Sequence, residues 1–221
     1  MPTGLVMRIL SVGTAIAMAL VSISGCDAGN GLDKVNGSVT VPAGAHANEA
    51  RTVNGAIAVG HDAVVGAVHT VNGAINLQAK AHAQSLKTVN GSVRIDAGAS
   101  VAGEVVTVNG GIQMAAGSTV DGRIVNVNGA ISLDHATVGG GIETVNGDVT
   151  IGSGAIVRGG LTVRRPQGLF GGANRAPRIV IAADATVQGT LRFDRPVDLQ
   201  VAPGAKIGPI VGATASAASG K

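Results

Sequence analysis

Aromatic residues are almost absent from this chain. Its 221 residues include no Trp, no Tyr and only two Phe. Because large aromatic side chains dominate burial in most globular cores, a thick core of the ordinary kind is excluded. Aliphatic residues are plentiful and charge is low, which also excludes an intrinsically disordered chain. The composition therefore favours a narrow interior in which small aliphatic side chains are enough at every level.

Cysteine is nearly as scarce, and the one copy, Cys26, has no partner for a disulfide within the chain. It ends the apolar run "ILSVGTAIAMALVSISGC" after Arg8, which is short for a membrane span and typical of a secretory signal. Its last four residues, Ile23 to Cys26, resemble the lipobox of bacterial lipoproteins, in which the Cys is lipidated. We expect a signal peptide at 1–25, a lipidated Cys26 and linker at 26–34, and a lipid-anchored protein of the bacterial cell envelope. It would face the periplasm in a Gram-negative cell; an ordinary signal or membrane anchor with an incidental Cys is the alternative.

Charged residues make up only 13% of the chain, and the formal net charge is +3. They are unevenly placed, because the segment from Arg158 to Lys221 has nine basic and three acidic residues. A basic end suits an anionic surface or polymer, although it is also typical of a solvated end without a partner. No aromatic residues accompany the Arg residues, so the stacking platform of a protein that binds single-stranded nucleic acid is missing. We expect no nucleic-acid partner.

What the chain has in abundance is glycine, 35 in all, and a repeated Val-Asn-Gly. Successive Asn residues of this motif are separated by 18, 18, 18, 19, 19 and 18 positions. Gly and β-branched residues at this density disfavour helix, and the repeat is shorter than known helical repeats. A regular spacing of about 18 residues fits one coil of a β-solenoid. The Asn residues are Asn36, Asn54, Asn72, Asn90, Asn109, Asn128 and Asn146.

The coil "VNGSVRIDAGASVAGEVVT" shows how each repeat folds. Val93 and Ile95 alternate with polar residues, as in a strand with one buried face. Further aliphatic residues follow at Val101 and Val105, and Gly separates the short segments where the chain must bend. Three short strands per coil predict a triangular section. We therefore predict an all-β, single-stranded β-solenoid of about nine coils at 35–210, with an insertion loop at 164–178 and a flexible tail at 211–221.

The Val-Asn-Gly motif has two interpretations. Asn and Gly both tolerate positive φ, so the motif can be a structural corner with Val in the core and Asn stacked into a ladder. Alternatively, Thr and Asn point outward around an inward Val and form a flat polar face for ice or a glycan. The Thr residues of that possible binding face are Thr52, Thr70, Thr88, Thr107, Thr144 and Thr162.

The insertion from Arg164 to Arg178 interrupts the repeat. Insertions in solenoids form loops, and loops often carry function, so this one is a possible partner site or a tolerated insertion. The residues that would make such a partner loop are Arg164, Arg165, Phe170, Arg175 and Arg178.

No catalytic constellation is visible. His46 and His82 share a coil position but lie two coils apart, roughly 9.6 Å, which is too far for one metal ion. The other histidines and the acidic residues fall at different positions, and neither a phosphate-binding Gly-Lys-Ser/Thr nor a Gly-x-Ser-x-Gly elbow occurs. The enzyme alternative is a resemblance to hexapeptide-repeat acyltransferases, whose 18-residue coils also carry an aliphatic residue every six positions. We expect no enzyme activity, no metal and no cofactor.

Phrases such as "GASVAGEVVTVNG", "GSTVDGRIVNVNG" and "GAIVRGGLTV" resemble the repeat of bactofilins, bacterial polymer-forming cytoskeletal proteins. The resemblance covers about residues 35–210 and implies a right-handed, triangular β-helix that polymerises end to end without nucleotide. The lipobox departs from the family, whose members usually act inside the cell, and the strict Val-Asn-Gly corners also resemble adhesin-like β-solenoids of bacterial envelopes. We expect a scaffold that forms homo-oligomers through its coil ends, where unpaired backbone groups and apolar residues are open to another copy. The C-terminal end is expected to pair less readily with another strand, because Pro has no backbone N–H to donate to a neighbouring strand. Its three Pro residues are Pro196, Pro203 and Pro209.

Overall fold

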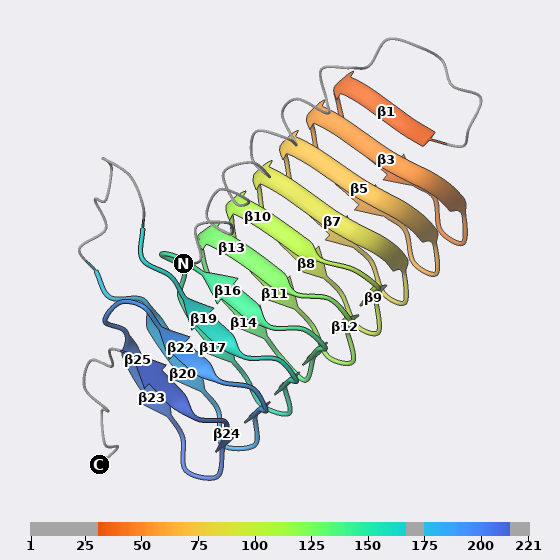
Figure 1. Ribbon diagram of the computed structural model, residues 1–221. Coiled ribbons are helices and arrows are strands. Elements are labelled where there is room, and N and C mark those ends of the chain that lie inside the picture. Colours follow the sequence, from red (N-terminus) through yellow and green to blue (C-terminus); the bar gives the residue numbers. More distant parts are fainter. Residues whose placement is uncertain (1–30, 167–174, 213–221) are drawn as a thin grey trace.

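The computed structural model describes residues 31–166 and 175–212, and it shows a rod of stacked parallel β-coils (Figure 1). Sheet B contains nine strands, one per turn, so the predicted β-solenoid of about nine coils is confirmed. No helix in the described part of the chain is long and apolar enough to cross a membrane. Cys26, Phe170, the signal segment 1–25 and residues 213–221 of the tail lie outside the described residues.

Sheet B forms one face of the rod. Each of its strands is short and pairs in parallel with the strand of the next coil, so that inward side chains stack on inward side chains. Its strands, in spatial order, are β2 (Val39–Val41), β4 (Ile57–Val59), β6 (Ile75–Leu77), β8 (Val93–Ile95), β11 (Ile112–Met114), β14 (Ile131–Leu133), β17 (Val149–Ile151), β20 (Arg178–Ile181) and β23 (Asp198–Val201).

Sheet A has 16 strands and divides into two branches. It begins with β1 (Gly31–Asn36), β3 (His46–Asn54), β5 (Val64–Asn72) and β7 (His82–Asn90). Beyond β7, one branch consists of β9 (Ser100–Val101), β12 (Thr119–Val120), β15 (Thr137–Val138), β18 (Ile156–Val157), β21 (Thr186–Val187) and β24 (Lys206–Ile207). The other branch consists of β10 (Val105–Asn109), β13 (Ile124–Asn128), β16 (Ile142–Thr144), β19 (Leu161–Val163), β22 (Leu191–Phe193) and β25 (Ile210–Gly212).

The division has a simple cause in the length of the coils. β3, β5 and β7 each contain nine residues, whereas the same part of the next coil, from Ser100 to Asn109, has one residue more. The additional residue forms a bend at Ala102–Gly103 and separates β9 from β10. The expected three strands per coil are therefore found from Ser100 onward, and in the first coils two of them are joined in one long strand.

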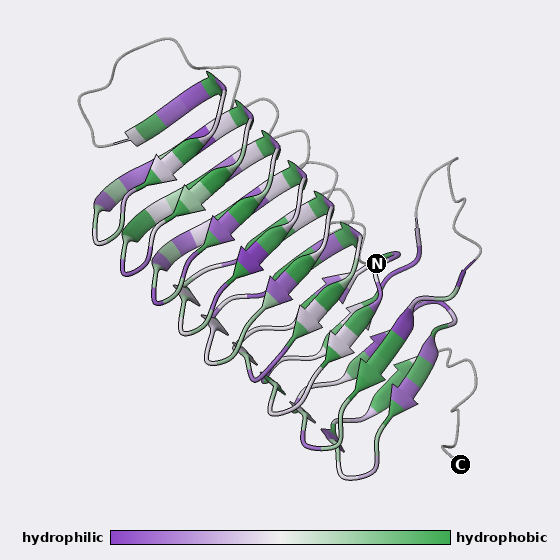
Figure 2. Ribbon diagram, turned by 180° about the vertical axis from the view of Figure 1, so that it is seen from behind, coloured by the Kyte–Doolittle hydropathy of each residue, from purple (hydrophilic) through white to green (hydrophobic). Residues whose placement is uncertain are grey.

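The interior is a single aliphatic column that runs the length of the rod. Both inward positions of sheet B are buried in every coil before the last, for example Val93 and Ile95 at 0% exposure. The second and third aliphatic positions of the repeat, such as Val101 and Val105, are buried to the same degree. Figure 2 shows the resulting alternation of hydrophobic and hydrophilic residues along the strands. The inward positions that period-2 alternation predicted are confirmed.

Candidate functional site

The Thr residues that precede Val-Asn-Gly point into the rod, not out of it. They have 0% exposure, and the expectation of an outward Thr face is wrong at Thr52, Thr70, Thr88, Thr107 and Thr144. The reason is strand alternation. Val105 is buried, so Thr107, two residues later, lies on the same inner side. Val108, between Thr107 and Asn109, is half-buried on the outer side, so the expectation that the Val of the motif lies in the core is also wrong.

A buried hydroxyl needs a hydrogen-bond partner, and the corner of the preceding coil supplies one. Thr52 Oγ1 donates to the carbonyl oxygen of Gly37 at 3.0 Å, and Thr70 Oγ1 donates to that of Gly55 at 3.0 Å. The same bond recurs from Thr88 and Thr107, at 3.1 and 3.2 Å. The Thr column therefore binds one coil to the next inside the rod and is not a ligand-binding face.

The column changes composition toward the C-terminal end. Asn126 replaces Thr, and its Nδ2 donates to the carbonyl oxygens of Gly110 at 3.2 Å and Gly129 at 3.0 Å. After Thr144 the same column continues with Val163 and then Phe193. Thr162 does not belong to it, because Thr162 pairs with Glu143 and Arg192 in a half-buried outward column.

The Asn residues of the motif form a continuous hydrogen-bonded ladder on the outside of the corner. The Nδ2 of each Asn donates to the Oδ1 of the Asn one coil earlier, at 2.8–3.0 Å. The ladder has a direction and a defined end, because Arg195 Nη1 donates to Asn146 Oδ1 at 2.7 Å. This direction leaves Asn36 as the first member, at the N-terminal end of the described rod.

The corner Gly is required by close packing more than by its φ angle. Among the Gly residues of the Val-Asn-Gly motifs, positive φ occurs only at Gly37 and Gly129, and no Asn of these motifs has positive φ. A Cβ built on Gly91 would instead lie 1.9 Å from the carbonyl oxygen of Gly73, and most corner glycines have the same conflict. The stacked coils approach too closely at this point for any side chain. The expectation that positive φ explains the Asn-Gly corner is therefore corrected.

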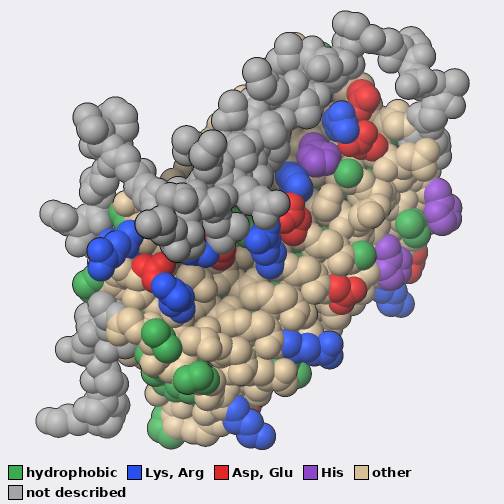
Figure 3. Space-filling view, viewed as in Figure 1, with side chains coloured by type: hydrophobic (Ala, Val, Ile, Leu, Met, Phe, Trp, Pro, Cys, Tyr) green, Lys and Arg blue, Asp and Glu red, His purple; other side chains and the backbone are tan. Residues whose placement is uncertain are grey.

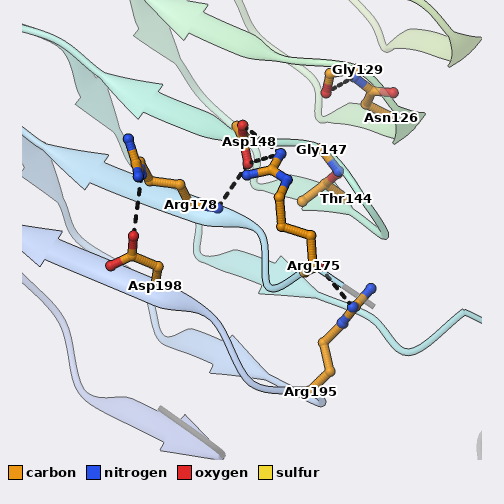
Figure 4. A network of polar contacts seen from close by, with 9 residues as sticks. All are labelled: Asn126, Gly129, Thr144, Gly147, Asp148, Arg175, Arg178, Arg195 and Asp198. Carbon is orange, nitrogen blue, oxygen red and sulfur yellow. Dashed lines mark hydrogen bonds and ion pairs between the residues drawn. The ribbon is translucent and has the colours of Figure 1, made fainter. Parts of the chain in front are cut away.

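The two arginines at the C-terminal end of the insertion, Arg175 and Arg178, are bound to the rod itself (Figure 4). Arg175 Nη2 donates to both carboxylate oxygens of Asp148, at 3.0 and 2.8 Å, and the backbone N–H of Arg178 donates to Asp148 Oδ1 at 2.8 Å. Arg178 Nε also donates to Asp198 Oδ2 at 3.2 Å. Burial by itself would raise the pKa of Asp148, but the bonds from Arg175 and Arg178 outweigh burial and lower it.

The two arginines at the N-terminal end of the insertion, Arg164 and Arg165, are also held by the rod. Arg164 Nε donates to Glu143 Oε1 at 2.6 Å, and Arg165 Nε donates to the backbone carbonyl of Asp194. The residues of the proposed partner loop are thus split: four arginines are bound to neighbouring coils, and Phe170 lies outside the described residues. Partner binding by this loop stays a prediction.

A second charged group lies on the outer side of the long strands, where Figure 3 shows acidic and basic side chains following one another along the rod. Arg51, His69 and Lys87 are neighbours in successive coils. Lys87 Nζ pairs with Glu104 at 2.7 Å, and His69 Nε2 lies 3.9 Å from Glu49 Oε1. Burial, together with the positive charges of Arg51 and Lys87, lowers the pKa of His69 to about 4.

Stability is expected to fall between pH 6.5 and pH 4 because of His69. The unfolded chain takes up a proton near pH 6.5, while folded His69 resists protonation down to about 4, so acid favours the unfolded state in this window. We expect a loss of about 2 kcal/mol that His69→Gln removes. Urea unfolding of both proteins at pH 7 and pH 4.5 checks this. Equal pH dependence in the two proteins would contradict the assigned role, because Glu104 and Asp148, whose pKa values are lowered, are present in both.

The remaining histidines make local contacts at separate places along the described rod. Among residues 31–166 and 175–212, no group of three or more His, Cys, Asp or Glu is placed to hold a metal ion. His61 and His135 each contact the Asp beside them, Asp62 and Asp134. His82 Nδ1 lies 2.5 Å from Ser100 Oγ in the next coil.

Comparisons with models of known protein families, with curated proteins and with solved structures find no match to this chain. The fold and the contacts within it are therefore the basis for the functional proposal.

Proposed function

We propose that this protein is a non-enzymatic, lipid-anchored scaffold of the bacterial cell envelope that self-associates through the ends of its rod. One observation carries the proposal. Of the seven large hydrophobic side chains exposed in the described part of the chain, five lie in the first strand or the last coil. They are Leu32, Val35, Val201, Ile210 and Val211.

The backbone supports association at the N-terminal end in particular. β1 pairs only with β3, and β2 only with β4, so in the described structure each leaves one edge without a partner strand. All six residues of β1 are exposed. An open parallel edge with apolar side chains can be continued by a strand of another copy, as each coil continues the one before it.

The charges of β1 favour contact between unlike ends. Asp33 lies in the outward column and Lys34 in the inward column, where Lys34 Nζ donates to the carbonyl oxygen of Ser38 at 2.8 Å. If two β1 strands met antiparallel with the outward columns of both rods on the same side, the registers nearest the strand centre would place Asp33 opposite Asp33 or Lys34 opposite Lys34. Like charges directly opposite are destabilising. At the other end, the column of Lys34 finishes at Gly212, which has no side chain to oppose it.

Lipidation at Cys26 would tether the rod by this N-terminal end. Cys26 lies five positions before the first residue of β1, so the anchor would be within about 18 Å of the first coil along an extended chain. The lipobox sequence supports this part of the proposal, and mass spectrometry of the protein purified from membranes tests it.

The association test uses one double variant for each end. Leu32→Asp with Val35→Asp places two charges at the first strand, and Ile210→Asp with Val211→Asp does so at the last. We expect each variant alone to sediment as a monomer, or nearly so, at concentrations where the parent associates. Burying an unpaired charge in the contact would raise the free energy of association. Mixing the two variants is expected to restore dimers, since each retains one intact end.

The matched control is Ile156→Asp, because Ile156 is 37% exposed in the middle of the rod and not at an end. It should associate like the parent. Association that persists in both end variants would contradict the proposal. Dimers of the Ile210/Val211 variant alone would instead show contact between like ends.

A further inference from the structure

The outer surface of the first three coils has an open notch of about 520 Å³, a volume in the usual range of ligand sites. It lies at the beginnings of β3, β5 and β7 and also includes Ala102. Figure 3 shows histidine side chains at the edge of the rod in this region. The notch begins on β3, which pairs with β1, so it lies beside the N-terminal end of the rod, on its outer side.

Two matching walls enclose the notch. One wall is His46-Ala47-Asn48 at the beginning of β3, and the other is His82-Ala83-Gln84 at the beginning of β7. The register places His46 beside Val64 and Val64 beside His82, so the walls stand at the same coil position, two coils apart. Their separation is roughly 9.6 Å, from two strand spacings.

The coil between the walls provides a low floor. Val64 is 38% exposed, and Gly66 faces Asn48 and Gln84 from the middle coil. A Cβ on Gly66 would lie 1.9 Å from the carbonyl oxygen of Asn48. No side chain can stand at that position, so the depth of the notch is fixed by the stacking of the backbone.

The chemistry of the lining selects a type of ligand. Each wall offers an imidazole and a carboxamide, which together donate and accept hydrogen bonds, and the floor offers an aliphatic surface. Among the described residues of the lining there is no Asp, Glu, Lys or Arg. The ring of His82 is oriented by the contact of its Nδ1 with Ser100 Oγ at 2.5 Å, which uses only one of the two ring nitrogens.

We propose that this notch binds one neutral, polyhydroxylated sugar ring of a glycan. Hydroxyl groups at the two edges of such a ring meet the His and carboxamide pairs, and its apolar face lies on Val64. A site that is open and lacks an aromatic platform binds weakly, with a Kd on the order of 1 mM for a single ring. Repeated rings of a polymer would raise the apparent affinity only if several rods display the notch together.

The test uses the full chain in detergent micelles and two neutral probes, chitotetraose and maltotetraose. Saturation-transfer NMR detects weak contact with the sugar protons, and titration gives the Kd. We expect transfer to at least one probe, a loss of binding in Val64→Arg, which fills the floor, and a two- to tenfold weaker Kd in His82→Ala, the range for one lost hydrogen bond.

The matched control is His61→Ala, since His61 is exposed in a turn that does not line the notch. Its binding should equal that of the parent, and far-UV circular dichroism should show the same fold for all variants. No transfer from the parent to either probe would overturn the proposal. So would undiminished binding in Val64→Arg.

Discussion

Gly91→Ala is expected to cost more than 4 kcal/mol of folding stability, or to prevent folding altogether. The new Cβ would lie 1.9 Å from the carbonyl oxygen of Gly73 and 2.4 Å from its carbonyl carbon. Neither backbone segment can easily move away. Gly73 accepts from Thr88 Oγ1, and the N–H of Gly91 donates to the carbonyl of Asn109 in the next coil. Losses of this size are exceptional for one methyl group and arise only where a tightly packed backbone is forced apart.

Gly117→Ala is the matched control for this prediction. Gly117 has φ +72°, but the nearest atom to its Cβ would be 3.7 Å away. Its cost comes from backbone strain alone, about 1–3 kcal/mol. Thermal unfolding followed by circular dichroism compares the two variants. Equal melting temperatures would contradict the claim that the contact between stacked corners is the reason for glycine at Gly91.

Phe193→Ala is expected to destabilise the C-terminal coils by about 3–5 kcal/mol, the usual range for removing a buried aromatic ring. Phe193 is 1% exposed and is the largest fully buried side chain of the described chain. It stacks on Val163 in the column that Thr occupies in earlier coils. Because coils contact only their neighbours, we expect the loss to be local and to spread toward β25 before it reaches β1.

Hydrogen exchange measured coil by coil checks both the size and the place of this effect. The control is Arg192→Ala, because the Arg192 side chain is 60% exposed and its ion pair with Asp194 lies at the surface, where such pairs contribute little. Protection lost equally over the whole rod would contradict the one-dimensional character of the fold. A Phe193→Ala protein as stable as Arg192→Ala would contradict the contribution assigned to the buried ring.

The sequence predicts the rod well because its repeat is local and periodic. The period of Val-Asn-Gly defines the coil, and alternation places Val93 and Ile95 in the core. The same alternation, counted forward from Val105, would have placed Thr107 inside, but the polar character of Thr suggested an outward face. Thr107 is buried because its hydroxyl donates a hydrogen bond to the carbonyl oxygen of Gly91 in the corner of the preceding coil.

Contacts made across the insertion were not predictable in the same way. Arg175 and Asp148 are 27 residues apart, and Arg195 and Asn146 are 49 apart, across an insertion that breaks the repeat. Periodicity says nothing about such pairs. The notch was also missed, although the recurrence of His-Ala-Asn at His46 and His-Ala-Gln at His82 was a signal that could have located it.

The most direct test of the central claim is electron microscopy of the chain from Asp27 onward, purified without lipid, over a range of concentrations. If the rod associates through its ends, end-to-end pairs or filaments should appear and lengthen with concentration, with a width that does not change. Single short rods at every concentration would contradict self-association through the coil ends.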